Sequence, residues 1–381
     1  MKILLVGEYS RLHNSLKEGL EMLGHNATIV APYDGFKKYD VDILIKKKYQ
    51  KGISRRIKNI IFKISGIDLV SLSIKRQILN LKTQLSNYDL VQFINEASFG
   101  CLAKTEREIF DLISNWNKNK TFLLSCGTDY ISVNFANDGL IRHSYLTPFK
   151  NGMDKKSLSS YGLKYLKPEY KILHEHIYSA ITGVIASDID YQLPLKGHSK
   201  FLGMIPNPVN TDLLTYNTPI IKDKIIIFHG INSDNYFKKG NDIFEGALAV
   251  IQKKYSEKIE IISVRSLPYN EYINAYNNCH ILLDQIYAYD QGYNALEAMA
   301  KGKVVFTGAE REWLDYYNLD EDLVAINALP DINYIAKKLE WLINNPDKIK
   351  TISENAKQFI EDHHNYIKSA QTYLNTWIKN L

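Results

Sequence analysis

The feature that most constrains the fold is a short apolar run followed by a helix-period segment, repeated along the chain. The first run, KILLV, ends at Gly7, and an amphipathic segment and a second apolar run follow it through Pro32. This order predicts a β-α-β opening with parallel strands. A doubly wound parallel α/β sheet is expected, because similar runs with helix-period segments between them recur at 88–94, 120–126 and 181–187.

The pattern stops and then restarts, which indicates two domains. Residues 206–223 hold three prolines and no core-like period, as is typical of a linker. After them, apolar runs alternate again with helical segments, at 224–230, 258–264, 280–286, 303–308 and 322–327. A chain of 381 residues also exceeds the roughly 100–200 residues of one domain. We predict two Rossmann-like domains that face each other across a cleft, and a C-terminal helix that packs back on the first, with boundaries at 1–205, 206–362 and 363–381.

Composition narrows the class of protein further. The content of 45% hydrophobic and 23% charged residues is typical of folded globular domains. No stretch of about 18 apolar residues is present, and the run before Gly7 is too short for a signal peptide. We therefore expect a protein that does not span a membrane. A reducing cytoplasm fits the cysteines, which have neither disulfide-framework nor zinc-ligand spacing, namely Cys101, Cys126 and Cys279.

A basic segment at 46–82 has its own pattern. It holds eleven lysines and arginines against one acid, Asp68. The arrangement is typical of a helix on an anionic membrane surface, because isoleucines recur at helical spacing, at Ile53, Ile57, Ile60, Ile61 and Ile64. That interpretation places the protein peripherally on the inner face of the cytoplasmic membrane. The alternative is a surface helix whose apolar face packs in the core. Nucleic acid is not expected as a partner, because no aromatic stacking set or known binding motif accompanies the charge.

Two predicted helix starts in the second half are suited to an anion. One follows Lys238 and Lys239 at Gly240, and the other is the stretch 292–294. A helix N-terminus presents unpaired backbone N–H groups and the positive end of the dipole, so a lysine there is unfavourable unless an anion offsets it. We predict that both starts converge on a diphosphate. The alternative for the two lysines is a solvated pair.

Glu297 is a carboxylate in the first turn of the second predicted helix, which Gly292, Tyr293 and Asn294 lead. A carboxylate there repels phosphate, so it needs another role. It can accept two hydrogen bonds from a vicinal diol such as that of ribose. The alternative is a capping box, in which Asn294 caps the helix and Glu297 bonds back to it; both roles can coexist.

The first domain offers candidates at the ends of two predicted strands. The turn after the first strand holds Gly7, Glu8, Ser10 and His13, without the GxGxxG fingerprint, so the pyrophosphate of NAD is not expected there. We predict that this turn lines a ligand site, with Gly7 and Glu8 on the donor side and Ser10 and His13 on the acceptor side; a simple tight turn is the alternative. Asp129, after another strand, is predicted to orient an acceptor hydroxyl, with helix capping as the alternative.

Four stretches together resemble the retaining glycosyltransferases of family 4 (glycosyl transferases group 1), over essentially the whole chain: KILLVGEYSRLHNSLKEGLEMLGHNATIVA, IPNPVNTDLL, GINSDNYFKKGNDI and DQIYAYDQGYNALEAMAKGKVVFTG. The resemblance implies the GT-B fold. It also implies that Glu297 binds the ribose of the donor, Lys239 its diphosphate and the glycine-led helix start its β-phosphate. The base would be held near Leu267.

The family pattern is incomplete at three places. Tyr289 stands where the family often has a second glutamate, eight positions before Glu297. An arginine that commonly follows the first strand of the nucleotide domain is missing at Gly230 and the two residues after it. The stretch 126–129 replaces a histidine-containing motif. Without that arginine, the negative charge of the phosphates would be neutralised by Lys239 together with Lys238 or Arg265.

We predict a retaining hexosyl- or N-acetylhexosaminyl-transferase that moves a sugar from a nucleoside diphosphate sugar, UDP favoured, to a glycan. Lys239 would stabilise the leaving diphosphate and Asp129 would act at the acceptor. No cofactor or obligatory metal is expected, because no DxD-like pair stands at a strand end. The basic segment favours a lipid-linked intermediate of surface polysaccharide or glycoconjugate synthesis as acceptor. The alternatives are a nucleotide-sugar epimerase or hydrolase on the same fold, and a catalytically silent nucleotide-sugar-binding protein.

Overall fold

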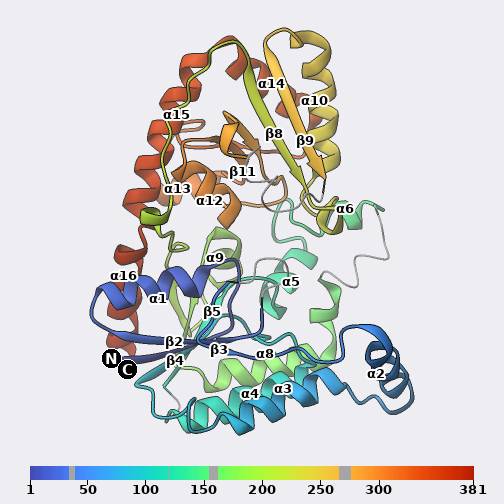
Figure 1. Cartoon of the computed structure of the whole chain (residues 1–381), viewed down its shortest axis with the longest axis vertical. Helices are drawn as coiled ribbons and strands as arrows, with labels where there is room; N and C mark the ends of the chain where they lie inside the picture. Colours follow the sequence, from blue (N-terminus) through green and yellow to red (C-terminus); the bar gives the residue numbers. More distant parts are fainter. Residues whose placement is uncertain (34–38, 119, 154–161, 266–275) are drawn as a thin grey trace. The chain divides into compact units, whose positions relative to one another are not determined.

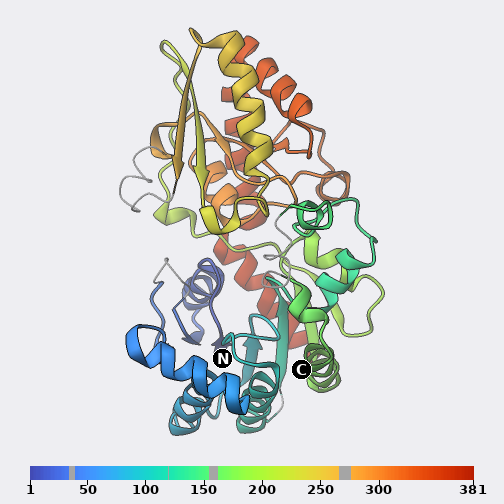
Figure 2. The same ribbon diagram turned by 90° about the vertical axis from the view of Figure 1, so that its right-hand side faces the viewer.

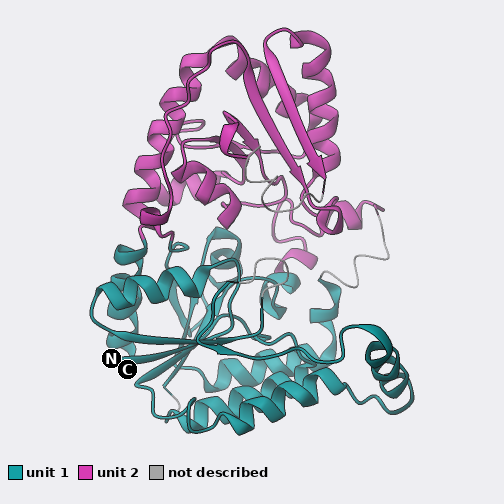
Figure 3. Cartoon of the chain, viewed as in Figure 1, with its two compact units in different colours: residues 1–134, 162–208, 366–381 teal, residues 135–161, 209–365 magenta. Residues whose placement is uncertain are grey.

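The chain forms two compact units in a computed structural model (Figure 3). Unit 1 comprises residues 1–134, 162–208 and 366–381, and unit 2 comprises 135–161 and 209–365. The chain therefore enters unit 2 twice. The residues that the structure describes are 1–33, 39–118, 120–153, 162–265 and 276–381.

Unit 1 contains a seven-stranded parallel sheet with the order β3-β2-β1-β4-β5-β6-β7. The chain adds strands on one side of β1 and then continues on the other, so the carboxyl ends of β1 and β4 flank a switch point, where open α/β sheets bind ligands. The strands are β1 Lys2–Val6, β2 Asn26–Ala31, β3 Ile43–Leu44, β4 Leu90–Phe93, β5 Thr121–Ser125, β6 Gly183–Ala186 and β7 Phe201–Met204.

Helices cover both faces of this sheet. The helices α3, α4 and α8 lie along one face, and α1 and α16 along the other (Figure 1). Helix α5 crosses from unit 1 into unit 2. The bounds are α1 Leu12–Met22, α2 Gly52–Ser65, α3 Leu69–Asn80, α4 Ala103–Trp116, α5 Tyr130–Asn137, α8 Pro168–Ala180, α9 Ile189–Leu195 and α16 Tyr366–Asn380.

The C-terminal helix α16 is part of the core of unit 1. Trp377 is fully buried, and its indole N–H donates to Oε1 of Gln92 at 3.2 Å. The amide Nε2 of Gln92 in turn lies 3.2 Å from Nε2 of His13 in α1. Helix α1 approaches closely because Gly19 has no side chain, and a Cβ there would lie 2.3 Å from the backbone oxygen of Tyr366.

Unit 2 contains a five-stranded parallel sheet with the order β12-β11-β10-β8-β9. Its switch point lies between β8 and β10, for the same topological reason as in unit 1. The strands are β8 Ile225–Ile231, β9 Ile259–Arg265, β10 Ile281–Leu283, β11 Val304–Thr307 and β12 Ile326–Asn327.

The helices of unit 2 pack on this sheet. Helix α10 packs against α14 (Figure 1). Phe244 of α10 is fully buried with apolar residues of the strands. Within the described part of the chain, no helix is long and apolar enough to cross a bilayer. The bounds are α6 Thr147–Lys150, α10 Asn241–Tyr255, α12 Tyr293–Ala300, α13 Arg311–Tyr317, α14 Ile332–Asn344 and α15 Pro346–Phe359.

The basic segment 46–82 forms two helices with different environments. Gly66, with φ 70°, ends α2, and Asp68 caps α3 through the N–H groups of Val70 and Ser71. Helix α3 buries Val70, Ser71, Ile74 and Ile78. Helix α2 buries no residue. The interpretation that the apolar face packs in the core is therefore right for α3 and wrong for α2.

Glu106 in α4 is a buried carboxylate in unit 1, with 3% of its surface exposed. Its Oε1 accepts a hydrogen bond from the N–H of Cys101 at 2.6 Å. Burial raises the pKa of Glu106 to about 7, although this bond and the charges of Lys47 and Lys164 oppose the shift. The carboxylate fixes the loop before α4, and its charged form lowers the free energy of unfolding, so the stability depends on pH.

We predict that Glu106 lowers the stability of unit 1 as the pH rises. A carboxyl whose pKa is raised by folding contributes fully below its ordinary value of 4.5, and this contribution is lost as the pH rises to about 7. The shift corresponds to roughly 3 kcal/mol in the free energy of unfolding. Urea unfolding across this range should show a larger loss in the wild type than in Glu106→Gln. Glu108→Gln, on the partly exposed side of the same helix, is the control and should behave like the wild type. Equal pH dependence in Glu106→Gln and the wild type would contradict this account.

Candidate functional site

An ion pair joins the loops that follow β8 and β10 at the switch point of unit 2. Nζ of Lys239 lies 2.9 Å from Oδ1 of Asp284, whose side chain is 1% exposed. Oδ1 of Asp284 also accepts a hydrogen bond from Nδ2 of Asn294 at 2.9 Å, and Oδ2 accepts one from the hydroxyl of Thr307 at 3.4 Å. A buried carboxylate is stable only when it is paired and hydrogen-bonded. One carboxylate therefore fixes Lys239, just before α10, and Asn294, in the first turn of α12.

Gly240 is required at the start of α10. Its φ is 71°, in the left-handed region, and a Cβ there would lie 2.8 Å from Cβ of Ile286. Lys238 is half-buried, with Nζ 5.1 Å from the centroid of the Tyr145 ring. Burial, and then the charge of Lys239, lowers the pKa of Lys238. The interpretation of a solvated lysine pair is therefore wrong, because both side chains are held against the protein.

The start of α12 is open and unstrained. Gly292 is the N-cap, with φ −81° and ψ 168°, and no side chain caps the helix. A Cβ at Gly292 would meet only Nε2 of Gln285, at an ordinary distance of 3.8 Å. Neither backbone conformation nor packing therefore demands a glycine. Its absence of a side chain leaves room beside a helix start, where the dipole favours an anion.

Glu297 lies in the second turn of α12, one turn later than predicted. The helix begins at Tyr293, so Asn294 is a helical residue that donates to Asp284 and does not cap the helix. The capping-box interpretation is therefore wrong. Glu297 is partly exposed, and among the residues that the structure describes none forms a hydrogen bond or ion pair with its carboxylate. This charge is available to a ligand.

Tyr289, at the position of the family's other glutamate, is buried and contacts Arg142. It is 1% exposed, and its hydroxyl accepts a hydrogen bond from the N–H of Arg142 at 2.9 Å. The guanidinium of Arg142 lies 4.8 Å from the centroid of the Tyr289 ring and pairs with Glu310 at 2.8 Å and Glu312 at 2.7 Å. These contacts explain why 135–161 groups with unit 2, although the sequence placed it in the first domain.

The other residues predicted on the donor side are spread over unit 2. Arg265, at the end of β9, pairs with Glu245 at 2.8 Å, so its charge is already balanced within the protein. Gly230 lies in β8, and Tyr293 is buried in the first turn of α12. Leu267 lies outside the described residues. The structure brings together the charges of Lys239 and Asp284. Lys238 precedes Lys239 in the chain, and Glu297 lies in the same helix as Asn294, which donates to Asp284.

In unit 1, the residues predicted after β1 mostly build the turn itself. Gly7 has φ 88°, and a Cβ there would lie 2.3 Å from Cγ2 of Ile94. Glu8 is 3% exposed, and its Oε2 accepts the N–H of Asn14 at 2.8 Å. His13 is fully buried and donates from Nδ1 to the oxygen of Gly7 at 2.7 Å. Burial lowers the pKa of His13 to about 4. The predictions that His13 binds an acceptor and that Glu8 binds a donor are therefore wrong, because both side chains hold α1 in place.

Ser10 differs from its neighbours in this turn. Ser10 and Arg11 have φ values of 52° and 77°, which are uncommon for residues with a side chain and recur at functional sites. Arg11 precedes α1 and pairs with Glu18 at 2.6 Å. Ser10 is partly exposed, so it remains a candidate for contact with a ligand.

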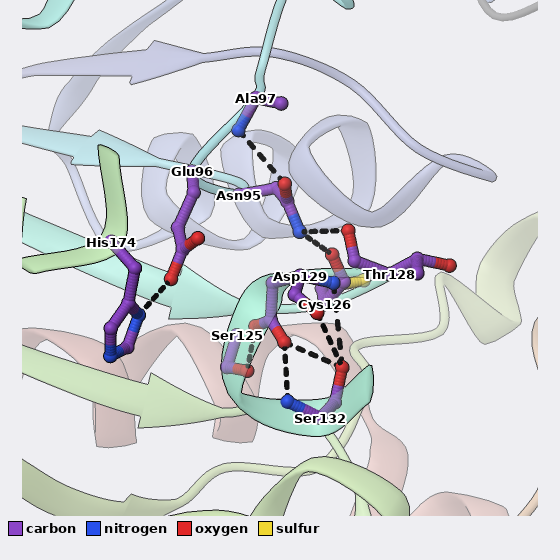
Figure 4. Close-up of polar contacts among 9 residues, drawn as sticks. All are labelled: Asn95, Glu96, Ala97, Ser125, Cys126, Thr128, Asp129, Ser132 and His174. Atoms are coloured by element: carbon purple, nitrogen blue, oxygen red, sulfur yellow. Dashed lines mark hydrogen bonds and ion pairs between the residues drawn. The ribbon is translucent and has the colours of Figure 1, made fainter. Parts of the chain in front are cut away.

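Asp129 caps α5 (Figure 4). It is 1% exposed, and its Oδ2 accepts the hydroxyl of Ser125 at 2.8 Å. Its Oδ1 accepts the N–H of Ser132 at 2.9 Å and the hydroxyl of the same residue at 2.5 Å. Both oxygens are thus used within unit 1. The capping interpretation is right, and the prediction that Asp129 orients an acceptor is wrong.

A second acidic group beside Asp129 was not predicted. Glu96 follows β4, and its Oε1 lies 2.6 Å from Nδ1 of His174 in α8 (Figure 4). Burial acts to lower the pKa of His174, but the hydrogen bond and charge of Glu96 outweigh it and raise this pKa. A carboxylate just after a buried strand was a usable signal for Glu96. Nothing local marked His174, which is 78 residues away.

A sequence match to a known protein family covers the region that contains the ion pair between Lys239 and Asp284. Residues 238–375 match the family model described as glycosyl transferase-like. The match spans Lys239, Asp284, Asn294 and Glu297. No curated protein matches the sequence.

Solved structures extend the likeness over the whole chain. Sucrose-phosphate synthase from Thermosynechococcus elongatus has a TM-score of 0.64 at 13% identity, covering 100% of this chain and 98% of the other. HepE from Anabaena, in complex with UDP and glucose, has a TM-score of 0.59 at 12% identity, covering 100% of both chains. A TarM mutant from S. aureus, in complex with Fondaparinux, alpha-GlcNAc-glycerol and UDP, has a TM-score of 0.60 at 13% identity, covering 99% of both.

Likeness at this level of identity shows the fold, and it confirms the GT-B class with two Rossmann-like domains. The family match over the C-terminal part and this fold together support a glycosyltransferase.

We predict that alanine destabilises the protein at Gly240 and has little effect on stability at Gly292. Gly240→Ala should lower the free energy of unfolding by roughly 1–3 kcal/mol, because of its left-handed φ and the contact with Ile286. Gly292→Ala should change it by less than about 0.5 kcal/mol, because its backbone is extended and its surroundings are open. Urea unfolding measures both. Equal losses at the two positions would show that Gly292 serves packing and not a ligand.

Proposed function

We propose that the protein is a glycosyltransferase that moves a sugar from a nucleoside diphosphate sugar, with UDP-sugars favoured, to a glycan acceptor. The observation that carries the proposal is the pair of helix starts that Asp284 joins through Lys239 and Asn294. Glu297, whose carboxylate contacts no other described residue through a hydrogen bond or ion pair, lies in the same helix as Asn294.

A diphosphate fits these helix starts. The ammonium of Lys239 has three N–H donors, of which the ion pair with Asp284 uses one, and its side chain is 31% exposed. The start of α12 adds backbone N–H groups and a dipole, and Gly292 lets a ligand approach the backbone closely. Departure of the diphosphate develops negative charge that these groups stabilise. We propose Lys239 as the catalytic residue of unit 2 and Lys238 as a supporting charge.

The carboxylate of Glu297 suits the ribose of the donor. It lies one turn beyond the start of α12, so it is displaced along the helix from the phosphate position. Its two oxygens accept hydrogen bonds from a vicinal diol. That HepE and TarM were solved with UDP supports a uridine nucleotide as the donor.

We propose that the reaction retains configuration and requires no metal. Retention is what the resemblance to family 4 implies, with the acceptor attacking on the face that the diphosphate leaves. Positive charge for the leaving group comes from Lys239 and the helix starts, which take the role that a cation would have. A hexosyl or N-acetylhexosaminyl group is the class of sugar we expect.

We predict that Glu297→Ala weakens UDP binding by roughly tenfold to a hundredfold, because hydrogen bonds to a charged group are lost. The fold should be unaffected, because Glu297 is partly exposed and makes no polar contact with a described side chain. Titration calorimetry with UDP measures the affinity. Glu245→Ala, a carboxylate of α10 that pairs with Arg265, is the control. Wild-type affinity in Glu297→Ala would place the nucleotide elsewhere.

Lys239→Ala needs a matched double variant, because it leaves the buried carboxylate of Asp284 without its ion-pair partner. We expect Lys239→Ala to weaken UDP binding and also to lower the thermal unfolding temperature. Lys239→Ala combined with Asp284→Asn should recover part of the stability and none of the affinity. Recovery of both would mean that Lys239 acts only by neutralising Asp284.

The direct test of the activity is incubation of the protein with UDP-sugars and glycan acceptors, followed by NMR. We expect a glycosidic product with the anomeric configuration of the donor. Donor that is epimerised or hydrolysed without an acceptor would favour the epimerase or hydrolase alternative. Binding without turnover would favour the catalytically silent one.

We also propose that α2 holds the protein reversibly on an anionic membrane surface, and that the acceptor is therefore a lipid-linked glycan of surface polysaccharide or glycoconjugate synthesis. Helix α2 extends from unit 1 with no buried residue (Figure 2). Its apolar stripe is exposed to solvent at Ile53 (74%), Ile57 (50%), Ile60 (58%) and Ile64 (81%).

Charge surrounds this stripe on α2. No acidic residue occurs between 46 and 67, and Arg55 and Arg56 line a hollow of about 560 Å³ at the start of the helix. Each basic residue near an anionic bilayer contributes about 1 kcal/mol before screening, and the isoleucines add the burial of apolar surface. Basic charge beside exposed apolar side chains matches a negatively charged lipid surface, such as the inner leaflet.

We predict that the protein sediments with phosphatidylglycerol vesicles, less so at high salt, and not with phosphatidylcholine vesicles. Ile57→Asp with Ile64→Asp should weaken this binding at least about tenfold, and Arg55→Glu with Arg56→Glu should do the same. Ile378→Asp, at a 57% exposed isoleucine of α16, is the matched control and should bind as the wild type does. Equal binding by the α2 variants and the wild type would rule out α2 as the membrane contact.

A further inference from the structure

We propose that His174 binds a hydroxyl group of the acceptor at the carboxyl edge of the sheet of unit 1, and that Glu96 is the positioning residue that fixes its tautomer. The inference rests on the proposed sugar transfer. It assigns to the acceptor side a pair of residues that no sequence motif identified.

The pair lies where the sheet of unit 1 can bind a ligand. Glu96 follows β4 and Asp129 follows β5, so both come from carboxyl ends of neighbouring strands. Nδ2 of Asn95 donates to the oxygen of Cys126 at 2.8 Å and ties these two ends together (Figure 4). His174 reaches the same place from α8. Ligands of open α/β sheets bind at this edge.

The bond between the two side chains sets the chemistry of the imidazole. The carboxylate of Glu96 accepts, so Nδ1 of His174 carries the proton. In the neutral ring, Nε2 is then a hydrogen-bond acceptor. The side chain of Glu96 is 1% exposed and that of His174 is 12% exposed. Nε2 of His174 has no hydrogen-bond partner among the described residues and is not one of the enclosed polar atoms, so it is the part of the pair that a ligand can reach.

Two tyrosine rings pack against the imidazole of His174, and two polar atoms beside it have no hydrogen-bond partner among the described residues. The ring of His174 lies between those of Tyr130 and Tyr178, with centroids 5.0 Å and 4.1 Å away. The hydroxyl of Tyr178 and Oε2 of Glu96 are buried without a hydrogen-bond partner among the described residues. Burial raises the pKa of Glu96, although the hydrogen bond with His174 and the backbone N–H of Tyr130 favour its charged form. The hydroxyl of Tyr178 and Oε2 of Glu96 are both enclosed, so a carbohydrate hydroxyl would contact the cluster through Nε2 of His174.

His174 takes up no proton in this proposal. It holds one hydroxyl of the acceptor and leaves the attacking hydroxyl free to react. Protonation of the imidazole would abolish the contact, because Nε2–H cannot accept. Acceptor use should therefore fall as the pH drops through the pKa of His174.

Several charged and titratable groups face His174, and Glu96 is the one that a single substitution can isolate. Glu96→Gln removes the main group that raises the pKa of His174. The fall in acceptor kcat/KM at acidic pH, which is the acid limb of the pH profile, should therefore move to lower pH. The groups that face the ring from the surrounding elements are Glu96, Asp129, Tyr130, Glu175, Tyr178 and His198.

The experiment compares acceptor kcat/KM with UDP affinity in His174→Ala, Glu96→Gln and a control. His176→Ala is the control, because His176 lies on the same helix and pairs with Asp111 at 2.6 Å in the same way. We expect His174→Ala to lower acceptor kcat/KM by at least about tenfold and to leave UDP affinity and donor hydrolysis unchanged. Added imidazole should restore part of the loss. His176→Ala should match the wild type in all of these.

Two results would overturn the inference: wild-type acceptor kcat/KM in His174→Ala, or an acid limb at the wild-type pH in Glu96→Gln. The second does not require that His174→Ala folds. A wild type that binds UDP and transfers sugar to no acceptor would count against the proposed function itself, and so is a distinguishable failure.

Discussion

The buried carboxylate of Asp284 is the interaction on which the site in unit 2 depends. It lies just after β10, at the switch point of the sheet, and is held there by the strand before it. Because a buried charge must be paired, it draws Lys239 and Asn294 to the same point. Two helix starts that come from different parts of the chain are thereby fixed relative to each other. The proposed diphosphate site needs this arrangement, since a displacement of about 1 Å is enough to weaken transition-state contacts.

The sequence predicted most of the strands, because parallel strands are buried on both faces and must be apolar throughout. The run 303–308, for example, is β11, Val304–Thr307. The sequence missed β3 and β7, the two edge strands of the sheet in unit 1. Glycine and lysine at a helix start are also local signals, and they identified Lys239, Gly240 and Gly292. The position of the cap was not readable to within two residues, so Asn294 was considered as the cap where Gly292 serves.

What the sequence could not predict depends on contacts between distant residues. His13 was predicted to bind the acceptor, but Gly7 and Gln92 satisfy both of its ring nitrogens in the core. Asp129 could have faced a ligand, and only the positions of Ser125 and Ser132 show that it caps a helix. The pairing of Glu96 with His174 and the contacts of Arg142 with Tyr289 and Glu310 likewise have no local signature.

The most direct measurement is a crystal structure of the protein soaked with a UDP-sugar. This account predicts the diphosphate in hydrogen-bond contact with Nζ of Lys239 and with backbone N–H groups at the start of α12, and the ribose hydroxyls against Glu297. A nucleotide bound away from these helix starts, or one whose ribose does not contact Glu297, would contradict it.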